Sequence, residues 1–391
     1  MITITYDEVF TFENLYKAHL KNRCARRSKK PIVKFEINML SHLFDLYKRL
    51  QSGKFKFGGY HTFYVREPKL REIQNMRYSD RIVQRTICEY ALAPYFSTKV
   101  IYDNCVCQKG KGLHFALERF EKMLRRLIDK HGVDCYFLKC DILKYFACIP
   151  HDNLKRVILS HIEDEKMRRL ICDIIDGYHT KIDFLTKYGV DSLGDEERTE
   201  RGVPIGNQTS QIFGMFYLDP IDRLIKERLR IKTYSRYMDD FVMAHPDKEY
   251  LREVLEILHA ACAELGLALN DKTQIFPFKN GITYLGYNYK IGENGKLIKT
   301  VKKTTKRRFR QKTSLLKKAY IEGLIDEKRL QQSSSSIMGH LSHAKSVKFI
   351  RELKIKLDID ALNKKRDAER QKNIPYREKI INEREYQQTY Q

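Results

Sequence analysis

The chain has 391 residues, more than one hydrophobic core usually supports, so we expect two or three subdomains. It carries 74 Lys and Arg residues against 50 Asp and Glu, and the formal net charge of +24 indicates a polyanionic partner. No segment is apolar over the length of a membrane span, so nucleic acid is favoured over a membrane as that partner.

The N-terminal part of the chain has helical periodicity. From residue 8 to about 52, apolar residues recur at helical spacing on either side of the basic stretch KNRCARRSKK, which predicts a cationic helical region. The stretch YHTFYV that follows alternates like a strand, and a basic turn then leads into an amphipathic helix. We expect this helix to begin near Ser79 and Asp80, which are favourable N-cap residues.

The middle of the chain combines short strands with acidic residues. CYFLKCDI (135–142) is rich in strand formers and places Asp141 near a strand end, and Pro150 precedes the restart of a helix. RGVPIGNQTSQ then predicts a loop that enters a helix, with Gly206 and Ser210 at the entrance. TYSRYMDDFVMAH (233–245) predicts two strands joined at two aspartates.

The remaining elements become increasingly basic. KEYLREVLEILHAACAELGL predicts a helix, and TYLGYNYKIGENGKLIKT predicts a hairpin with a turn at Asn294-Gly295. Past residue 298 we expect a densely basic helix, a turn at the serine-rich stretch QQSSSS and another helix. The last charged stretch is expected to be partly disordered.

Three aspartates are the candidate catalytic residues. Adjacent Asp239 and Asp240 are often no more than solvated turn residues, but here Asp141 ends an apolar strand upstream and a glycine-containing loop lies between them. Metal-dependent phosphoryl transfer needs this set of parts, with two hard cations held roughly 3.5–4 Å apart by carboxylates. Two Mg²⁺ ions are therefore expected as cofactors, with Mn²⁺ as the alternative.

The order of DILKYF, PIGNQTSQ, YMDD, NDKT and YLGY resembles motifs A to E of reverse transcriptases, over residues 60 to about 345. The resemblance implies an α+β right-hand polymerase fold with fingers, a palm of antiparallel sheet and helices, and a helical thumb. It also implies that Asp141, Asp239 and the backbone of Ile142 bind metal, and that Asp240 supports the site or a metal.

The same resemblance sets the expected domain boundaries. They are 1–134 for the N-terminal helical region and fingers, 135–298 for the palm with an insertion at about 155–200, 299–370 for the basic helical thumb, and 371–391 for a charged tail.

Further site residues are carried over from the family motifs. Phe146 resembles the aromatic gate that clashes with a ribonucleotide 2′ hydroxyl, with a plain core Phe as the alternative. Arg71 resembles the fingers arginine that holds the incoming triphosphate, assisted by Lys69, although either side chain is also compatible with a solvated surface charge. Lys272 resembles the lysine that protonates the leaving pyrophosphate, which would make it a catalytic residue. The primer grip would be formed by Tyr284, Leu285 and Gly286.

The segment IGNQTSQ departs from the common family pattern. Ile205 stands where many reverse transcriptases have Gln, and Gln211 stands where they have Pro; both, with Gly206, are expected to lie at the nucleotide. The form I-G-x-x-x-S-Q resembles the reverse transcriptases of diversity-generating retroelements, in which it is linked to misincorporation opposite template adenines. A lost hydrogen bond to the nascent pair would account for such errors, and a neutral packing change is the alternative.

The basic helix after residue 298 resembles a thumb that grips a template-primer duplex through phosphates, with a solvated basic face as the alternative. We expect six residues to contact nucleic acid: Lys302, Lys303, Lys306, Arg307, Arg308 and Arg310. No cluster of cysteines and histidines follows and little chain remains, so we expect neither an endonuclease nor a full maturase extension. We also expect no RNase H domain, because the remaining residues are too few for one.

The nine cysteines are scattered, which predicts reduced thiols rather than a zinc site or a disulfide framework. The acidic N-terminus lacks the pattern of a signal peptide, so we expect a cytoplasmic protein.

The predicted function is an RNA-directed DNA polymerase, the error-prone reverse transcriptase of a diversity-generating retroelement. Its expected partners are a template RNA, an RNA–DNA or primer duplex, deoxynucleoside triphosphates, a dedicated structured RNA and a small basic accessory protein, and no membrane. One alternative is a bacterial antiphage-defence reverse transcriptase that uses a noncoding RNA. A second is a non-polymerising RNA-binding or splicing-assistance protein.

Overall fold

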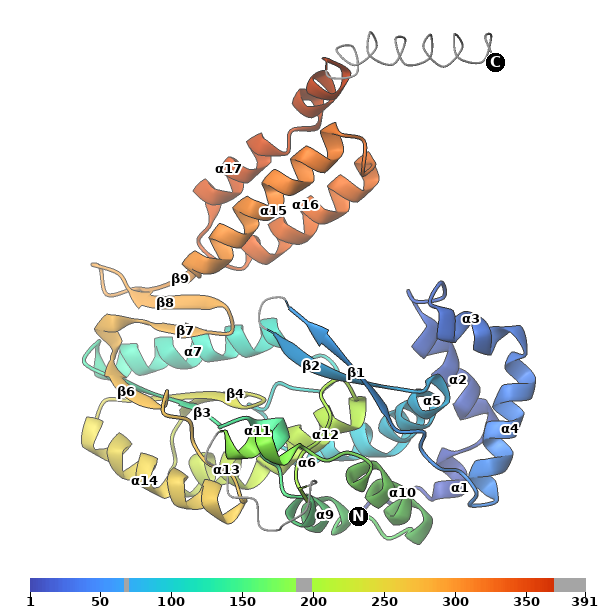
Figure 1. Ribbon diagram of the computed structural model, residues 1–391. Helices are drawn as coiled ribbons and strands as arrows, with labels where there is room; N and C mark the ends of the chain where they lie inside the picture. The colour runs from blue at the N-terminus through green and yellow to red at the C-terminus, as the bar shows by residue number, and fades with distance from the viewer. Residues whose placement is uncertain (67–69, 188–198, 369–391) are drawn as a thin grey trace, which may run out of the picture. The chain divides into compact units, whose positions relative to one another are not determined.

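The computed structural model describes residues 1–66, 70–187 and 199–368 (Figure 1). The chain divides into two compact units, Met1–Pro277 and Phe278–Gln391, which are described in turn. The hairpins after Phe278 pack with the helices that follow them, so the second unit also contains residues 278–298 of the expected palm. In that second unit Tyr287 donates a hydrogen bond to the carbonyl of His340 at 2.9 Å.

The first unit begins with the expected helical region. Thr5 and Thr11 cap the first two helices with their hydroxyl groups, and the Thr5 cap is completed by Glu8. The fourth helix buries Leu46 and Leu50 in the main core, as its helical spacing predicts. The elements are α1 (Tyr6–Val9), α2 (Phe12–Arg23), α3 (Lys30–Ile37) and α4 (Met39–Gln51).

A two-stranded hairpin follows, where only its first strand was expected. β1 (Tyr60–Val65) pairs antiparallel with β2 (Arg71–Met76), and α5 (Tyr78–Ile87) starts almost at once. The expected N-caps are therefore wrong, since Arg77 takes the cap position and Asp80 lies inside the first turn. The Asp80 carboxylate instead accepts a hydrogen bond from the backbone of Gly58 at 2.8 Å.

The core of the first unit is built around a four-stranded antiparallel sheet in the order β4-β5-β3-β6. The predicted strands at Asp141 and on either side of the aspartate pair are confirmed. The inner strands β3 and β5 carry buried apolar residues such as Leu138 and Phe241, and β5 is buried at four consecutive positions. Their bounds are β3 (Tyr136–Asp141), β4 (Thr233–Tyr237), β5 (Asp240–His245) and β6 (Gln274–Pro277).

Helices cover this sheet and its edge. The long helix α7 contacts β4, and α14 contacts β3 and β6 (Figure 1). The helix predicted after the aspartates is confirmed as α14. The helical elements after α5 are η1 (Cys88–Leu92), α6 (Ala93–Lys99), α7 (Leu113–His131), α8 (Tyr145–Cys148), α9 (His151–Leu159), α10 (Glu165–Asp176), α11 (Ile182–Thr186), α12 (Gln208–Tyr217), α13 (Asp219–Arg223), η2 (Leu224–Arg228) and α14 (Lys248–Glu264).

The second unit joins a three-stranded antiparallel sheet to a helical bundle. The predicted hairpin is confirmed, with Asn294 and Gly295 in the turn between β8 and β9. The expected serine-rich turn is wrong, because QQSSSS lies inside α16. The elements are η3 (Phe278–Asn280), β7 (Ile282–Tyr284), β8 (Tyr287–Ile291), β9 (Leu297–Val301), α15 (Lys303–Ile321), α16 (Glu327–Ser342) and α17 (Val347–Lys356).

Packing explains the helical state of the serine-rich stretch. Leu330, Ile337 and Leu341 of α16 are buried, so a helix places one apolar stripe against the rest of the bundle. The Asp326 side chain caps this helix by accepting from the backbone of Arg329 at 2.7 Å. Tertiary burial thus outweighs the weak helix propensity of serine.

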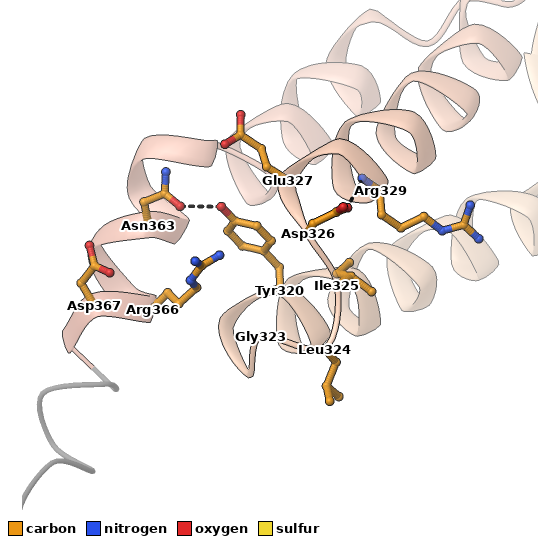
Figure 2. A pocket seen from close by; sticks show the side chains of 10 residues that line it. All are labelled: Tyr320, Gly323, Leu324, Ile325, Asp326, Glu327, Arg329, Asn363, Arg366 and Asp367. Carbon is orange, nitrogen blue, oxygen red and sulfur yellow. Dashed lines mark hydrogen bonds between the residues drawn. The ribbon is translucent and has the colours of Figure 1, made fainter.

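The C-terminal end of the described second unit holds a cavity of about 830 Å³ (Figure 2). On its wall, the Tyr320 hydroxyl donates to Asn363 Oδ1 at 2.5 Å, and the Arg366 guanidinium lies 5.1 Å from the Tyr320 ring centroid. These contacts tie the end of the described chain to α15. Within residues 1–66, 70–187 and 199–368, no helix is both long and apolar enough to cross a bilayer.

Candidate active site

The central sheet brings the three candidate aspartates together. Asp141 is the last residue of β3, and it pairs directly with Asp240, the first residue of β5. Asp239 lies in the tight turn that joins β4 to β5. Residues far apart in the sequence therefore present carboxylates at one end of the sheet.

Burial and mutual repulsion raise the proton affinity of two of these groups. Burial is the main cause of the raised pKa of Asp239, with further increases from the charges of Asp141 and Asp240, and Arg71 opposes the shift. Burial also raises the pKa of Asp240, against the attraction of Lys139, whose Nζ lies 3.3 Å from Asp240 Oδ1. A cluster of oxygen ligands that repel one another fits the preference of hard divalent cations.

A buried arginine supports the turn that carries Asp239. Arg236 is fully buried, and its guanidinium binds both carboxylate oxygens of Asp222, with Nε to Oδ1 at 2.7 Å and Nη2 to Oδ2 at 2.5 Å. Nη1 donates to the carbonyl of Met238 at 3.1 Å, and Met238 has a left-handed backbone with φ of +59°. Burial alone would lower the pKa of Arg236, but Asp222 raises it above its usual value.

The sequence analysis did not identify this pair. The available signal was a charged residue, Arg236, inside the predicted strand TYSRY, because a charged side chain needs a partner when it is buried. The identity of that partner, Asp222, depends on the packing of α13 against the sheet.

The IGNQTSQ loop (residues 205–211) lies against the hairpin of β1 and β2. The backbone N–H of Gln74 donates to the carbonyl of Ile205 at 3.0 Å, and the Ile205 side chain remains 39% exposed. Gly206 has φ of +124°, and a Cβ there would lie 3.0 Å from the carbonyl oxygen of Gln74. This position therefore requires glycine.

The expectations for Ser210, at the helix entrance, and for Gln211, at the nucleotide, concern the same segment. Ser210 does not mark the helix entrance, because α12 begins at Gln208 and Ser210 is buried in its first turn. Gln211 is exposed, on the same helix.

Phe146 lies between the sheet and α12. Its ring lies beside Tyr145, 5.3 Å between centroids, and a Cβ added at Gly214 would come within 3.0 Å of it. The Tyr145 hydroxyl donates to the carbonyl of Gly214 at 2.6 Å. Phe146 is partly exposed, and its role as a gate stays a prediction.

Of the three basic side chains expected at the nucleotide, the structure describes Arg71 and Lys272. Arg71 is exposed at the start of β2, and its charge is near enough to Asp239 to oppose the rise in the pKa of that carboxyl. Lys69 lies outside the described residues. Lys272 is exposed in a turn whose Asn270 backbone N–H donates to the Asp141 carbonyl at 2.7 Å, so this turn is held against the end of β3.

The remaining candidates belong to the second unit. Leu285 and Gly286 form the turn between β7 and β8, with φ of +47° and +87°, next to Tyr284 at the end of β7. Two positive φ values are typical of a tight hairpin turn. The structure keeps these three expected primer-grip residues in one short hairpin.

Of the basic residues expected to contact nucleic acid, Lys302, Lys303, Arg307 and Arg308 are exposed and Lys306 is half-buried. Arg310 is engaged within the bundle, since its Nε and Nη2 each lie 2.9 Å from an oxygen of Glu352. Its guanidinium also lies 4.9 Å from the Phe349 ring centroid.

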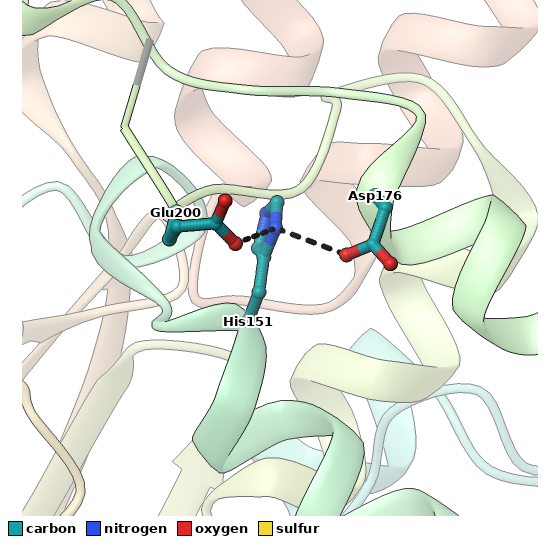
Figure 3. A group of neighbouring side chains, drawn as sticks. All are labelled: His151, Asp176 and Glu200. Carbon is teal, nitrogen blue, oxygen red and sulfur yellow. Dashed lines mark ion pairs between the residues drawn. The ribbon is translucent and has the colours of Figure 1, made fainter. Parts of the chain in front are cut away.

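A second cluster of acidic side chains, Asp176 and Glu200, surrounds His151 (Figure 3). The sequence analysis did not identify this cluster. The imidazole is buried, its Nε2 lies 2.8 Å from the carbonyl of Gly202, and its Nδ1 lies 3.6 Å from Asp176 and 4.0 Å from Glu200. Since a carbonyl only accepts, Nε2 carries the proton. Lys155 already pairs with Asp176 at 2.6 Å, which makes this cluster an ion-pair network that fixes the chain before Ile205.

Comparison with known proteins places these features in a family. The family model described as "Reverse transcriptase (RNA-dependent DNA polymerase)" matches residues 66–289. Protein P of duck hepatitis B virus (isolate brown Shanghai duck S5) is 30% identical over 146 residues, which cover 36% of this chain and 16% of the viral protein. The putative COX1/OXI3 intron 2 protein of Saccharomyces cerevisiae is 22% identical over 326 residues, 64% of this chain and 34% of that protein.

Among solved structures, apo telomerase from Candida tropicalis superposes with a TM-score of 0.41 at 15% identity, over 60% of this chain and 46% of that one. The chain thus spans less than half the length of these relatives. The family model, in contrast, covers more than half of this chain and includes all three aspartates and the IGNQTSQ loop. The chain belongs to the reverse transcriptase family, whose right-hand α+β fold it shares.

Proposed function

We propose that the protein is an RNA-directed DNA polymerase that copies a template RNA into DNA. The observation that carries this proposal is the direct pairing of Asp141 with Asp240 beside the Asp239 turn. Burial raises the pKa values of Asp239 and Asp240, and the charge of Asp141 adds to both shifts, as expected for neighbouring carboxylates that suit divalent cations. Family membership supports the same activity.

The carboxylates Asp141 and Asp239, with the carbonyl of Ile142, would hold two Mg²⁺ ions, and Asp240 would support them or bind one. Mn²⁺ is the alternative cation. When bound, the ions supply charge that activates the primer 3′ hydroxyl and stabilises the leaving pyrophosphate.

Protein side chains would complete the site. Arg71 would hold the triphosphate through its paired N–H groups, assisted by Lys69, and Lys272 would donate a proton to the pyrophosphate. The Phe146 ring would exclude a 2′ hydroxyl. In this assignment residues 1–134 hold the N-terminal helical region and the fingers, residues 135–298 hold the palm, and the basic α15 belongs to a thumb that grips duplex phosphates.

We further propose that this polymerase serves a diversity-generating retroelement. The I-G-x-x-x-S-Q form supports this class, and the exposure of Ile205 argues against a mere packing change, because an exposed alkyl group fills no core. The partners would be a dedicated structured RNA and a small basic accessory protein. An antiphage-defence reverse transcriptase shares the same core and remains the alternative class.

Primer extension by the purified chain tests both the proposed polymerase activity and the proposed retroelement class. We expect Mg²⁺-dependent DNA synthesis on an RNA template, with errors concentrated opposite template adenines in the sequenced products. Accurate synthesis would support the defence class. Absence of synthesis, with the native RNA and partner supplied and RNA binding intact, would support a non-polymerising RNA-binding protein.

A further inference from the structure

A basic cleft lies in the first unit, away from the aspartates. It has a volume of about 590 Å³ and lies between the C-terminal half of α7, the chain after η2 and the ends of β4 and β5. The lining residues are Arg119, Met123, Arg126, Leu127, Lys130, His131, Lys226, Arg230, Ile231, Lys232, Thr233, Ala244, His245 and Pro246. We call this site the α7 cleft.

The ionisable side chains that line the α7 cleft are all basic. Its lining contains six Lys and Arg side chains, two His and no Asp or Glu. Asp103 pairs with two of the cations, with Arg119 Nε at 2.7 Å and Lys226 Nζ at 2.8 Å. The other four, Arg126, Lys130, Arg230 and Lys232, are exposed and make no ion pair within the described part of the chain.

The loop that carries two of these cations is fixed. Arg230 adopts a left-handed backbone with φ of +52°, which is uncommon for a residue with a side chain. The backbone of Ile231 donates to Ile225 at 3.0 Å, and Lys226 Nζ donates to the carbonyl of Lys232 at 3.2 Å. The cations therefore converge without the loss of loop freedom that usually weakens binding.

The α7 cleft is separated from the candidate active site along β5. Asp240 begins this strand and His245, a lining residue, ends it. At about 3.4 Å per residue, roughly 17 Å of strand lies between them. A primer terminus at the aspartates would thus leave the cleft free for a different segment of nucleic acid.

We propose that the α7 cleft is a second RNA-binding site, which anchors the phosphates of a structured RNA outside the copied template. The four unpaired cations would bind phosphates, while the apolar floor formed by Met123, Ile231 and Ala244 would contact a ribose or base. A basic accessory protein is a poor occupant for this site, since like charges repel. This inference adds a site to the proposed polymerase, but its test does not depend on DNA synthesis.

The test uses the full chain and first saturates the proposed template-primer site with an unlabelled RNA–DNA hybrid. It then measures binding of a labelled hairpin RNA of about 60 nucleotides. The cleft variant combines Arg126→Ala, Lys130→Ala and Lys232→Ala. The control variant removes the same charge from exposed positions outside the cleft, with Lys54→Ala, Lys122→Ala and Arg169→Ala. Affinity is measured from about 50 to 200 mM salt, and primer extension is run in parallel.

We expect the cleft variant to bind the hairpin at least tenfold more weakly, with the slope of log affinity against log salt reduced by about two, because up to three phosphate contacts are lost. The control variant should bind as the wild type does. Equal binding by all three proteins, or equal loss in both variants, would overturn the proposal. So would tenfold weaker binding of labelled poly-glutamate to the cleft variant with hairpin binding unchanged, since it would identify an acidic protein as the occupant.

The two proposals fail separately. If no variant extends a primer but the cleft variant alone loses the hairpin, the polymerase proposal fails and the second RNA site stands. If primer extension is normal and the cleft variant binds the hairpin as the wild type does, the polymerase proposal stands and the second RNA site fails.

Discussion

Arg236 donates a hydrogen bond to the carbonyl of Met238 at 3.1 Å, so a fully buried guanidinium holds the turn that presents Asp239. The other side of the guanidinium binds Asp222, and the Tyr234 hydroxyl donates to the same carboxylate at 2.5 Å. The turn that carries Asp239 is therefore positioned by a buried ionic network, which is sensitive to the loss of either partner.

Arg236→Leu should lower the free energy of unfolding by about 3–5 kcal/mol, because it leaves the Asp222 carboxylate buried without a partner. Urea denaturation of the full chain measures the change. The combined Arg236→Leu and Asp222→Leu variant should recover part of the loss. As a matched control, Arg252→Leu on the exposed face of α14 should change stability little, since Arg252 pairs with Glu249 in solvent. Equal effects at both arginines would contradict the positioning role of Arg236.

Asp239→Asn should abolish Mg²⁺-dependent DNA synthesis and preserve RNA binding. It should also raise the melting temperature at pH 7 without divalent cations. In the wild type the folded-state pKa of Asp239 is raised, so its contribution to stability is fully present below the unfolded value, about 3.9, and is lost as pH rises through the folded pKa. The amide of the Asp239→Asn variant does not titrate, so the variant should lose less stability than the wild type as pH rises over this range.

Thermal melts from pH 4 to 8, with EDTA or with Mg²⁺, measure these effects. Mg²⁺ should raise the melting temperature of the wild type more than that of Asp239→Asn. Asp271→Asn, at an exposed position, is the control and should behave as the wild type does. The same Mg²⁺ shift in all three proteins would count against Asp239 as a metal ligand.

Ile205→Gln should reduce errors opposite template adenines several-fold, because an amide restores a hydrogen-bonding group beside the nascent pair. Sequencing of primer-extension products gives the error spectrum, and errors opposite the other template bases are the internal reference. Ile205→Leu keeps an alkyl group of the same size and should leave the spectrum unchanged. If both variants behave alike, Ile205 does not act through its missing polar group.

Phe146→Val should increase the use of ribonucleotides relative to deoxynucleotides by on the order of tenfold or more, because the smaller side chain leaves space for a 2′ hydroxyl. Single-nucleotide extension with each substrate gives the ratio of kcat/KM values. Phe146→Tyr keeps the ring and should retain discrimination. A ratio that does not change in the Val variant would identify Phe146 as packing for Gly214 alone.

Much of the local structure could be predicted from the sequence. The apolar run before Asp141, the paired runs around Asp239 and Asp240, and the periodicity of the N-terminal helices determine their own secondary structure, since each pattern depends on neighbouring residues only. The order of the family motifs likewise determined the family. The strand β2 was not predicted, because its alternation is weak and its stability comes from pairing with β1.

Tertiary structure decided what these elements do together. The register that sets Asp141 opposite Asp240, the partner of Arg236 and the convergence of α7 with the ends of β4 and β5 all join residues far apart in the chain. The serine-rich stretch became helical for the same reason, since burial of Leu330, Ile337 and Leu341 outweighs local propensity. Sequence patterns report short-range preferences, whereas strand register, buried charge pairs and clefts depend on long-range packing that only the folded chain establishes.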